Sequence, residues 1–140
     1  MIFVDAGVFY ARFAERDRHH EAADRFFAGL LTSPVPLVTT TAVLYETHAL
    51  MLRISRVEPR EDLRPAAKRF LEELRAGLAR VVHVTPDDHR RGLDLVERHA
   101  DKSYSVCDAI SFVVMERLRI KRAASFDRHF RQYGKFNVVL

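Results

Sequence analysis

The stretch SYSVCDAISFVVM, residues 103–115, predicts a helix that is apolar almost all the way round and yet contains the carboxylate of Asp108. A carboxylate in apolar surroundings loses hydration worth several kcal/mol, so it must be neutralised, hydrogen-bonded, paired or bound to a metal. One explanation needs no function, because Ser105 at the N-cap and Asp108 at the third helical position form an acidic variant of the capping box. The stretch by itself leaves the structural and the functional explanation open.

Length and composition favour a single domain over residues 1–140. A hydrophobic fraction of 48%, with 10 Phe, is ample for one core. No apolar stretch approaches the ~18 to 20 residues that cross a bilayer, and residues 1–9 lack the features of a signal peptide. We therefore expect a cytoplasmic protein with no membrane partner. The one cysteine, Cys107, excludes an internal disulfide, and its apolar neighbours predict a buried, unreactive thiol.

Short strand-like segments alternate with helix-like segments along the chain. The strand-like segments lie at residues 2–4, 36–39, 80–85, 123–125 and 136–140. The helix-like segments follow Asp5 and Ser105 and also cover residues 15–31, 41–55, 59–77 and 86–100. Strands that alternate with helices over one short chain predict a parallel sheet covered on both faces, an α/β sandwich.

Four acids occupy structurally similar places in this pattern. In an open α/β sheet the reactive crevice lies beyond the carboxyl ends of the strands. Asp5 follows the first strand, Asp127 follows the strand at residues 123–125, and Asp108 lies in the first turn of the helix before that strand. Glu46 falls on the apolar face of its helix, where a glutamate is out of place. Each acid also has an ordinary explanation as a cap, a turn or a side chain that reaches to the edge of its face.

Four carboxylates that converge would repel one another, and at least one would be forced neutral unless a cation were bound. Divalent cations remove this conflict. A set of hard oxygen ligands without a cysteine cluster or an obligatory histidine indicates Mg²⁺ or Mn²⁺ and not Zn²⁺. The seven histidines have no metal-ligand spacing, so we interpret them as surface or core polar residues.

Four segments resemble the acidic motifs of PIN-domain ribonucleases, specifically the VapC-type toxins of VapBC toxin-antitoxin pairs. The segments are MIFVDAGVFYA, LVTTTAVLYE, ADKSYSVCDAISFVVM and AASFDRHF. Their order and approximate spacing match along nearly the whole chain. The resemblance implies a PIN-like α/β/α sandwich with a central, mostly parallel sheet of four to five strands. It also implies a metal-dependent endoribonuclease that a cognate antitoxin holds inactive.

The resemblance further implies roles for individual residues. Asp5 and Asp108 would be the central ligands of one or two Mg²⁺ or Mn²⁺ ions, and Glu46 and Asp127 would bind directly or through water. Two such ions can activate a water and screen the leaving oxygen in phosphodiester hydrolysis. Ser125 occupies the hydroxyl position that supports the site. The family often has Ser, Thr or Asn two positions after the first Asp, and this chain departs from that pattern at Gly7.

Basic residues slightly outnumber acidic ones, since 23 Lys and Arg against 19 Asp and Glu leave a formal charge of +4. This balance suits an RNA substrate, which by the resemblance is tRNA or rRNA. The preferred candidates for phosphate contacts are Arg12, Arg16, Lys102 and Arg128, with Arg90, Arg91 and Arg131 behind them. For each of them a solvated surface charge is the simpler interpretation, and Lys102 could equally pair with Asp101. Tyr104 and Phe126 could stack on a base, but core packing is the simpler interpretation.

The sequence also predicts binding partners for the protein and leaves alternative functions open. Apolar surface near residues 49–55 and 65–74, together with the resemblance, predicts a homodimer and a VapB-like antitoxin. The alternative function is a catalytically weak PIN-like RNA-binding module, in which Gly7 marks an eroded site. A signalling domain of receiver type fits less well, because it would pair two acids after its first strand and keep a lysine beyond a late strand.

Overall fold

The computed structural model describes residues 1–58 and 61–140 and contains an all-parallel sheet of five strands in the order β3-β2-β1-β4-β5. The strands are β1 (Ile2–Val4), β2 (Leu37–Thr40), β3 (Arg80–Val82), β4 (Arg122–Ala124) and β5 (Asn137–Val138). The central strand β1 pairs with both neighbours through Phe3, which lies opposite Val38 on one side and Ala123 on the other. The predicted parallel sheet of four to five strands is confirmed, and all four pairings are parallel.

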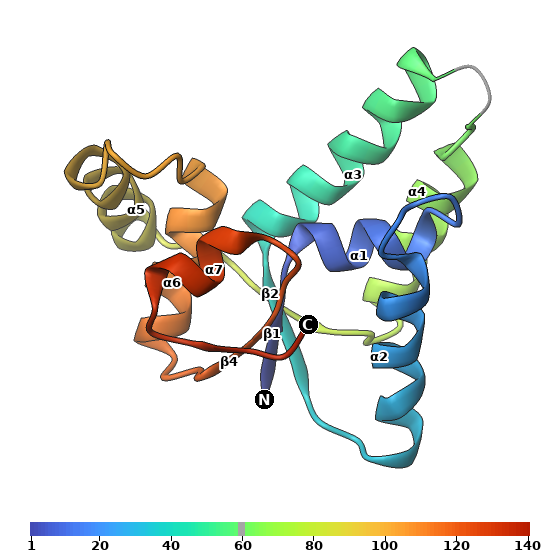
Figure 1. Cartoon of the computed structure of the whole chain (residues 1–140), viewed down its shortest axis with the longest axis horizontal. Helices are drawn as coiled ribbons and strands as arrows, with labels where there is room; N and C mark the ends of the chain where they lie inside the picture. Colours follow the sequence, from blue (N-terminus) through green and yellow to red (C-terminus); the bar gives the residue numbers. More distant parts are fainter. Residues whose placement is uncertain (59–60) are drawn as a thin grey trace.

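Helices cover both faces of this sheet (Figure 1). They are α1 (Ala6–Phe13), α2 (His20–Thr32), α3 (Thr41–Val57), α4 (Arg64–Arg75), α5 (Pro86–Arg98), α6 (Val106–Arg117) and α7 (Arg128–Tyr133). In Figure 1, α1, α2 and α4 lie on one side of the central strands, and α5, α6 and α7 lie on the other. The predicted α/β/α sandwich is therefore present. Among the described residues, no helix combines the length and apolar character that crossing a membrane requires.

Helix α6 is the centre of the second helical layer. Every residue from Ala109 to Met115 is buried, as the apolar stretch at residues 103–115 predicts. Helix α5 packs closely on α6 at Gly92, where an added Cβ would lie 2.7 Å from Cγ1 of Ile110. The buried carboxylate of Asp88 accepts two hydrogen bonds of 2.8 Å from Arg117 and so ties the start of α5 to the end of α6.

Two element boundaries differ from the predicted ones because local hydrogen bonds intervene. The helix expected from residue 15 begins only at His20, since the chain first turns and the N–H of His19 donates to the carboxylate of Asp17. The strand expected to reach residue 85 ends at Val82, because Thr85 serves as the N-cap of α5. Both differences follow from short polar side chains that bind nearby backbone.

The helix expected over residues 59–77 is shorter, and residues 59 and 60 lie outside the described part. Helix α4 begins at Arg64, whose backbone and side chain both donate to the carboxylate of Asp62. Its predicted stop at Gly77 is supported by a left-handed backbone conformation there, with φ of 95°. The strand expected over residues 136–140 is confined to Asn137–Val138.

Candidate active site

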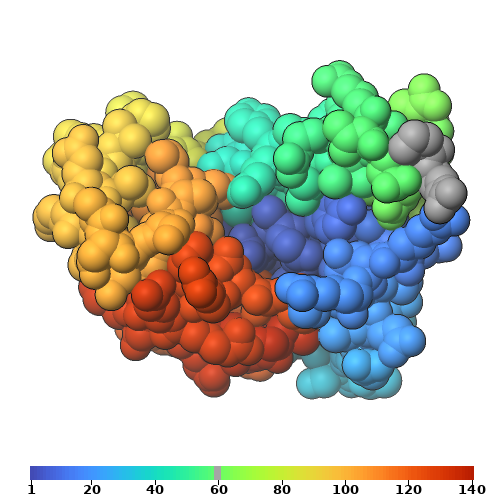
Figure 2. Space-filling view, turned by 45° about the horizontal axis from the view of Figure 1, so that its top comes forward, coloured from blue at the N-terminus to red at the C-terminus, as the bar shows by residue number. Residues whose placement is uncertain are grey.

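The carboxyl ends of the central strands and the starts of four helices meet on one face of the molecule. Asp5 follows β1 and caps α1, Asp127 follows β4 and caps α7, and Asp108 lies in the first turn of α6. Figure 2 shows this face, where the dark blue residues at the start of α1 are recessed between the teal start of α3 and the orange and red residues of α6 and α7. The structure thus brings the predicted acids near one another at this end of the sheet.

Asp5 lies at the bottom of this site, with 7% of its surface exposed. Its Oδ1 accepts the N–H of Ala6 at 2.7 Å, and its Oδ2 accepts the hydroxyl of Ser125 at 2.8 Å. The pKa of Asp5 is raised from 3.8 to about 7, chiefly by burial and further by the negative charges of Asp108 and Glu46, while the Ser125 hydrogen bond lowers it. A nearby cation would therefore favour the ionised form of Asp5 at neutral pH.

Ser125 connects two of the acids. Its hydroxyl donates to Asp5 and accepts the backbone N–H of Asp127 at 3.0 Å. The side chain is fully buried, so this geometry is held by the surrounding core. The hydroxyl position implied by the family resemblance is thus in contact with the site.

Asp108 is both a cap and a member of the site. Its N–H donates to the hydroxyl of Ser105 at 3.0 Å, and its Oδ2 accepts the N–H of Ser105 at 2.9 Å, which completes the predicted capping box. Burial raises the pKa of Asp108, the charge of Asp127 adds to this, and the hydrogen bonds with Ser105 and the nearby His129 lower it. The structural and functional explanations posed from the sequence are therefore compatible.

His129 is a member of the site that the sequence analysis missed. Its Nδ1 lies 3.1 Å from Oδ1 of Asp127 and 3.5 Å from Oδ2 of Asp108. These three residues form a group whose potential ligand atoms all lie within 4.8 Å of one another. A sequence signal existed, because His129 stands two positions after Asp127 in the first turn of α7, but histidine spacing along the chain did not reveal it.

Glu46 lies at the exposed rim of the site, and its predicted place on the apolar face of its helix was wrong. Helix α3 buries Val43, Thr47 and Met51, which recur every four residues, and Glu46 lies outside that row and is exposed. Its carboxylate interacts electrostatically with the thiol of Cys107 and with the carboxylate of Asp5.

Cys107 is half-buried beside this group of acids. Burial first, and then the hydrogen bond and charge of Glu46, raise the pKa of the Cys107 thiol far above its usual range. A thiol that stays protonated is a poor nucleophile, which agrees with the predicted unreactive thiol.

Gly7 leaves room beside the carboxylate of Asp5. A Cβ at this position would lie 4.0 Å from Oδ2 of Asp5, an ordinary contact distance. A Cβ is therefore tolerated at this position, and in this chain Oδ2 of Asp5 already accepts the hydrogen bond of Ser125.

Apart from Arg128, which follows Asp127 directly, the preferred basic residues have partners or neighbours other than the four acids. Arg12 lies 3.5 Å from Glu73 and 3.7 Å from Asp24, and its guanidinium lies over the ring of Phe27, so it links α1 to α2 and α4. Lys102 pairs with Asp101 at 3.0 Å, as its alternative interpretation anticipated.

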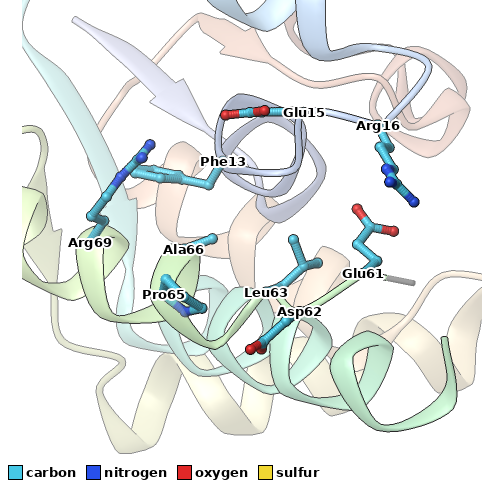
Figure 3. A pocket seen from close by; sticks show the side chains of 9 residues that line it. All are labelled: Phe13, Glu15, Arg16, Glu61, Asp62, Leu63, Pro65, Ala66 and Arg69. Atoms are coloured by element: carbon cyan, nitrogen blue, oxygen red, sulfur yellow. The ribbon is translucent and has the colours of Figure 1, made fainter. Parts of the chain in front are cut away.

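Arg16 lines a separate pocket of about 290 Å³ between the end of α1 and the start of α4 (Figure 3). In Figure 3 its side chain points toward Glu61 across the pocket mouth, and none of the four predicted acids lines this pocket. Arg128 is exposed directly after Asp127, and within the described residues it forms no ion pair. The remaining candidates have local partners, since Arg90 and Arg91 pair with Asp87 and Arg131 donates to the backbone oxygen of Leu140.

An all-parallel α/β/α sandwich with carboxylates gathered at one end of its sheet has the features of a metal-dependent nuclease, because metal-assisted phosphodiester hydrolysis uses such a ligand cluster. The model of the PIN domain family matches residues 2–136, and the chain belongs to this family.

Known relatives agree with this family assignment. The 23S rRNA-specific endonuclease VapC20 from each of two Mycobacterium tuberculosis strains is 34% identical over 134 residues, which cover 96% of this chain and 95% of the relative. The crystal structure of Mycobacterium tuberculosis VapC20, described as a sarcin-ricin loop cleaving toxin, matches with a TM-score of 0.82 and 32% identity over 99% of this chain and 98% of that one. The predicted VapC-type PIN endoribonuclease is confirmed.

Proposed function

We propose that this protein is a metal-dependent toxin of the VapC type that cuts 23S rRNA in the sarcin-ricin loop and is held inactive by a VapB-like antitoxin. In this proposal residues 1–140 form a single nuclease domain that acts in the cytoplasm. The observation that carries the proposal is the convergence of Asp5, Asp108 and Asp127 at one end of the sheet. The similarity to VapC20 over nearly the full length of both chains supports the choice of RNA.

The residues present fit a divalent cation. Within the described residues, the carboxylate of Asp5 receives hydrogen bonds from uncharged groups alone, Ala6 and Ser125, while the charges of Asp108 and Glu46 raise its pKa. A bound cation would relieve this repulsion, and carboxylate oxygens are the ligands that Mg²⁺ and Mn²⁺ accept. When bound, one or two such ions supply an activated water and stabilise the leaving oxygen of the phosphodiester.

The chain's own residues position these groups. Asp5 and Asp108 hold the ion or ions, and Asp127 and the exposed Glu46 bind directly or through water. Ser125 fixes the carboxylate of Asp5 and the backbone of Asp127 relative to each other through its two hydrogen bonds. Arg128 extends from the rim of the site, where it can contact an RNA phosphate.

The proposed partners are a VapB-like antitoxin and a second copy of the chain. Exposed apolar side chains support both, notably Tyr45 at 65% and Val57 at 69% exposure. An apolar groove of about 550 Å³ adjoins Tyr45 and is lined also by Leu44, Leu71 and Val81. Soluble monomers rarely expose a large contiguous apolar patch to solvent, so a protein partner is expected to cover this surface.

The test is cleavage of a labelled sarcin-ricin hairpin by the purified protein, and by Asp5→Asn and Asp127→Asn, in Mg²⁺, in Mn²⁺ and in EDTA. We expect a discrete cut with either ion, none in EDTA, and a loss of about 100-fold or more in each variant, since each removes a charge that holds the ion. A hairpin with a scrambled loop is the substrate control. Undiminished cleavage in excess EDTA would contradict the metal mechanism, and tight binding without cleavage in either ion would favour the RNA-binding alternative.

A further inference from the structure

The ring of His129 faces two of the site's acids. The residue is the second of α7, whose N-cap is Asp127, and its backbone N–H donates to Oδ1 of Asp127 at 2.8 Å. This bond holds the carboxylate of Asp127 at the start of α7, where Nδ1 of the His129 ring lies 3.1 Å from the same oxygen. The ring also packs edge-to-face against Tyr104, with centroids 5.4 Å apart, so its orientation is restricted.

Hydrogen bonding within the described part of the chain does not explain why both ring nitrogens of His129 are buried. Both are buried, and neither has a hydrogen-bond partner among residues 1–58 and 61–140. The 3.1 Å contact of Nδ1 with Asp127 is therefore close but is not aligned as a hydrogen bond. A buried polar atom without a partner costs free energy. We therefore expect a bound group to satisfy the ring nitrogen that faces the acids.

The distances around Nδ1 suit a shared cation. In a six-coordinate ion with ligand bonds of about 2.1 Å, neighbouring ligand atoms lie about 3.0 Å apart. Nδ1 lies 3.1 Å from an oxygen of Asp127 and 3.5 Å from an oxygen of Asp108. The nitrogen and the two oxygens can therefore occupy adjacent positions around one ion after small side-chain movements.

We propose that His129 binds, through Nδ1, the metal ion held by Asp108 and Asp127, and that this nitrogen makes the site favour a first-row transition ion such as Mn²⁺ over Mg²⁺. The inference rests on the proposed function only in taking the metal at this site as real. Its chemical basis is that Mg²⁺ prefers oxygen ligands throughout, whereas imidazole binds transition ions more strongly.

Electron spin-echo spectroscopy of the Mn²⁺-loaded protein tests the inference directly, because it detects the ¹⁴N nucleus of a coordinated imidazole. We expect this signal in the wild-type protein and its loss in His129→Gln. The affinity for Mn²⁺, measured by calorimetry, should fall by about tenfold or more in His129→Gln and that for Mg²⁺ by less than about threefold. His89→Gln, which changes an exposed histidine of α5, is the matched control and should leave both affinities and the signal unchanged.

A second variant identifies the nitrogen and guards against misfolding. The amide oxygen of asparagine can occupy the place of Nδ1, whereas that of glutamine reaches toward Nε2. His129→Asn should therefore lose the ¹⁴N signal, keep more of the Mn²⁺ affinity than His129→Gln, and discriminate less between the two ions.

The outcomes separate this inference from the proposed function. Absence of the ¹⁴N signal in a wild-type protein that binds Mn²⁺ and cuts RNA would overturn the role of His129 alone. Unchanged Mn²⁺ affinity in His129→Gln would overturn it as well. A clear ¹⁴N signal in a protein that cuts no RNA with either ion would support His129 as a ligand and reject the proposed function.

Discussion

The carboxylate of Asp5 lies where burial and two neighbouring negative charges oppose its ionisation. The hydrogen bond from Ser125 compensates for only part of this effect, because the pKa remains raised to about 7. An unfolded aspartate titrates near 3.8, so the folded protein holds a proton that the unfolded chain releases. Without a bound cation, Asp5 is therefore a source of pH-dependent stability.

We expect the metal-free protein to become less stable as the pH rises. The contribution of Asp5 is fully present below about pH 4 and is lost progressively up to about pH 7, a change on the order of a few kcal/mol. Thermal melting in EDTA between about pH 5 and pH 8 measures it. The melting temperature of Asp5→Asn should fall less over this range than that of the wild type. Parallel pH profiles would show that Asp5 is ionised in the folded protein well below neutrality.

At the scale of the elements, the first turn of α6 has two tasks. The capping box of Ser105 and Asp108 satisfies backbone groups that the start of a helix leaves unpaired. The same carboxylate belongs to the group that contains Asp127 and His129. A substitution that keeps the cap but removes the charge can separate the two tasks.

Asp108→Asn is that substitution. We expect the metal-free variant to be as stable as the wild type or more so, because the amide oxygen can still accept the N–H of Ser105 and one crowded charge is removed. Stabilisation by Mn²⁺, roughly 2.7 kcal/mol at 100 times the dissociation constant, and RNA cleavage should both be lost. Thermal melting with and without Mn²⁺ and a cleavage assay measure these effects.

Ser105→Ala is the matched control, because it weakens the cap and keeps the charge. Its expected effect is a loss of about 1 kcal/mol in stability with ion binding retained. If Asp108→Asn instead melted lower without metal, still gained stability with Mn²⁺ and still cut RNA, Asp108 would be a cap only.

The packing of α5 on α6 depends on a glycine. An added Cβ at Gly92 would meet both the side chain and the backbone of Ile110, at 2.7 and 3.3 Å. We expect Gly92→Ala to lower the free energy of unfolding by about 1 to 3 kcal/mol, because the backbone of α6 cannot move without disturbing the core. Urea denaturation measures the loss. Gly29→Ala is the control, since no described atom outside its own stretch of helix lies within 4 Å of the added Cβ, and it should be neutral or slightly stabilising.

At the scale of the whole molecule, the sheet assembles a site from distant parts of the chain. Because all its strands are parallel, their carboxyl ends lie at one edge, and the chain returns to that edge after β1 and again after β4. Asp5, Glu46, Asp108 and Asp127 thereby come near enough for their charges to interact. The same architecture leaves apolar side chains exposed on α3.

These exposed side chains lead us to expect a dimer in solution. Light scattering over a range of concentrations should give about twice the chain mass of 16.2 kDa, and Tyr45→Glu should shift the mass toward that of one chain. A charge at this exposed position has little cost within one chain but a large one in an apolar interface. A constant monomer mass at all concentrations, with no small protein co-purifying from the native host, would contradict the predicted partners.

The sequence by itself determined the features that depend on neighbouring residues. The capping box of Ser105 and Asp108, the stop at Gly77 and the alternation of strands and helices all follow from hydrogen bonds or periodicities within a few positions. Such patterns can be identified in a single chain because the interacting groups have a fixed spacing. The order of the four acids, and the places of Asp5 and Asp127 after strands, belonged to the same class of information.

The tertiary structure alone decided which distant side chains meet. It placed His129 against Asp108, moved Glu46 from the expected apolar face to the exposed rim beside Cys107, and joined Arg12 to Glu73. These contacts link residues that no periodicity relates, since they depend on how whole helices pack and rotate on the sheet. Spacing along the chain therefore indicated where the acids lie, and packing determined which groups surround them and how strongly their charges interact.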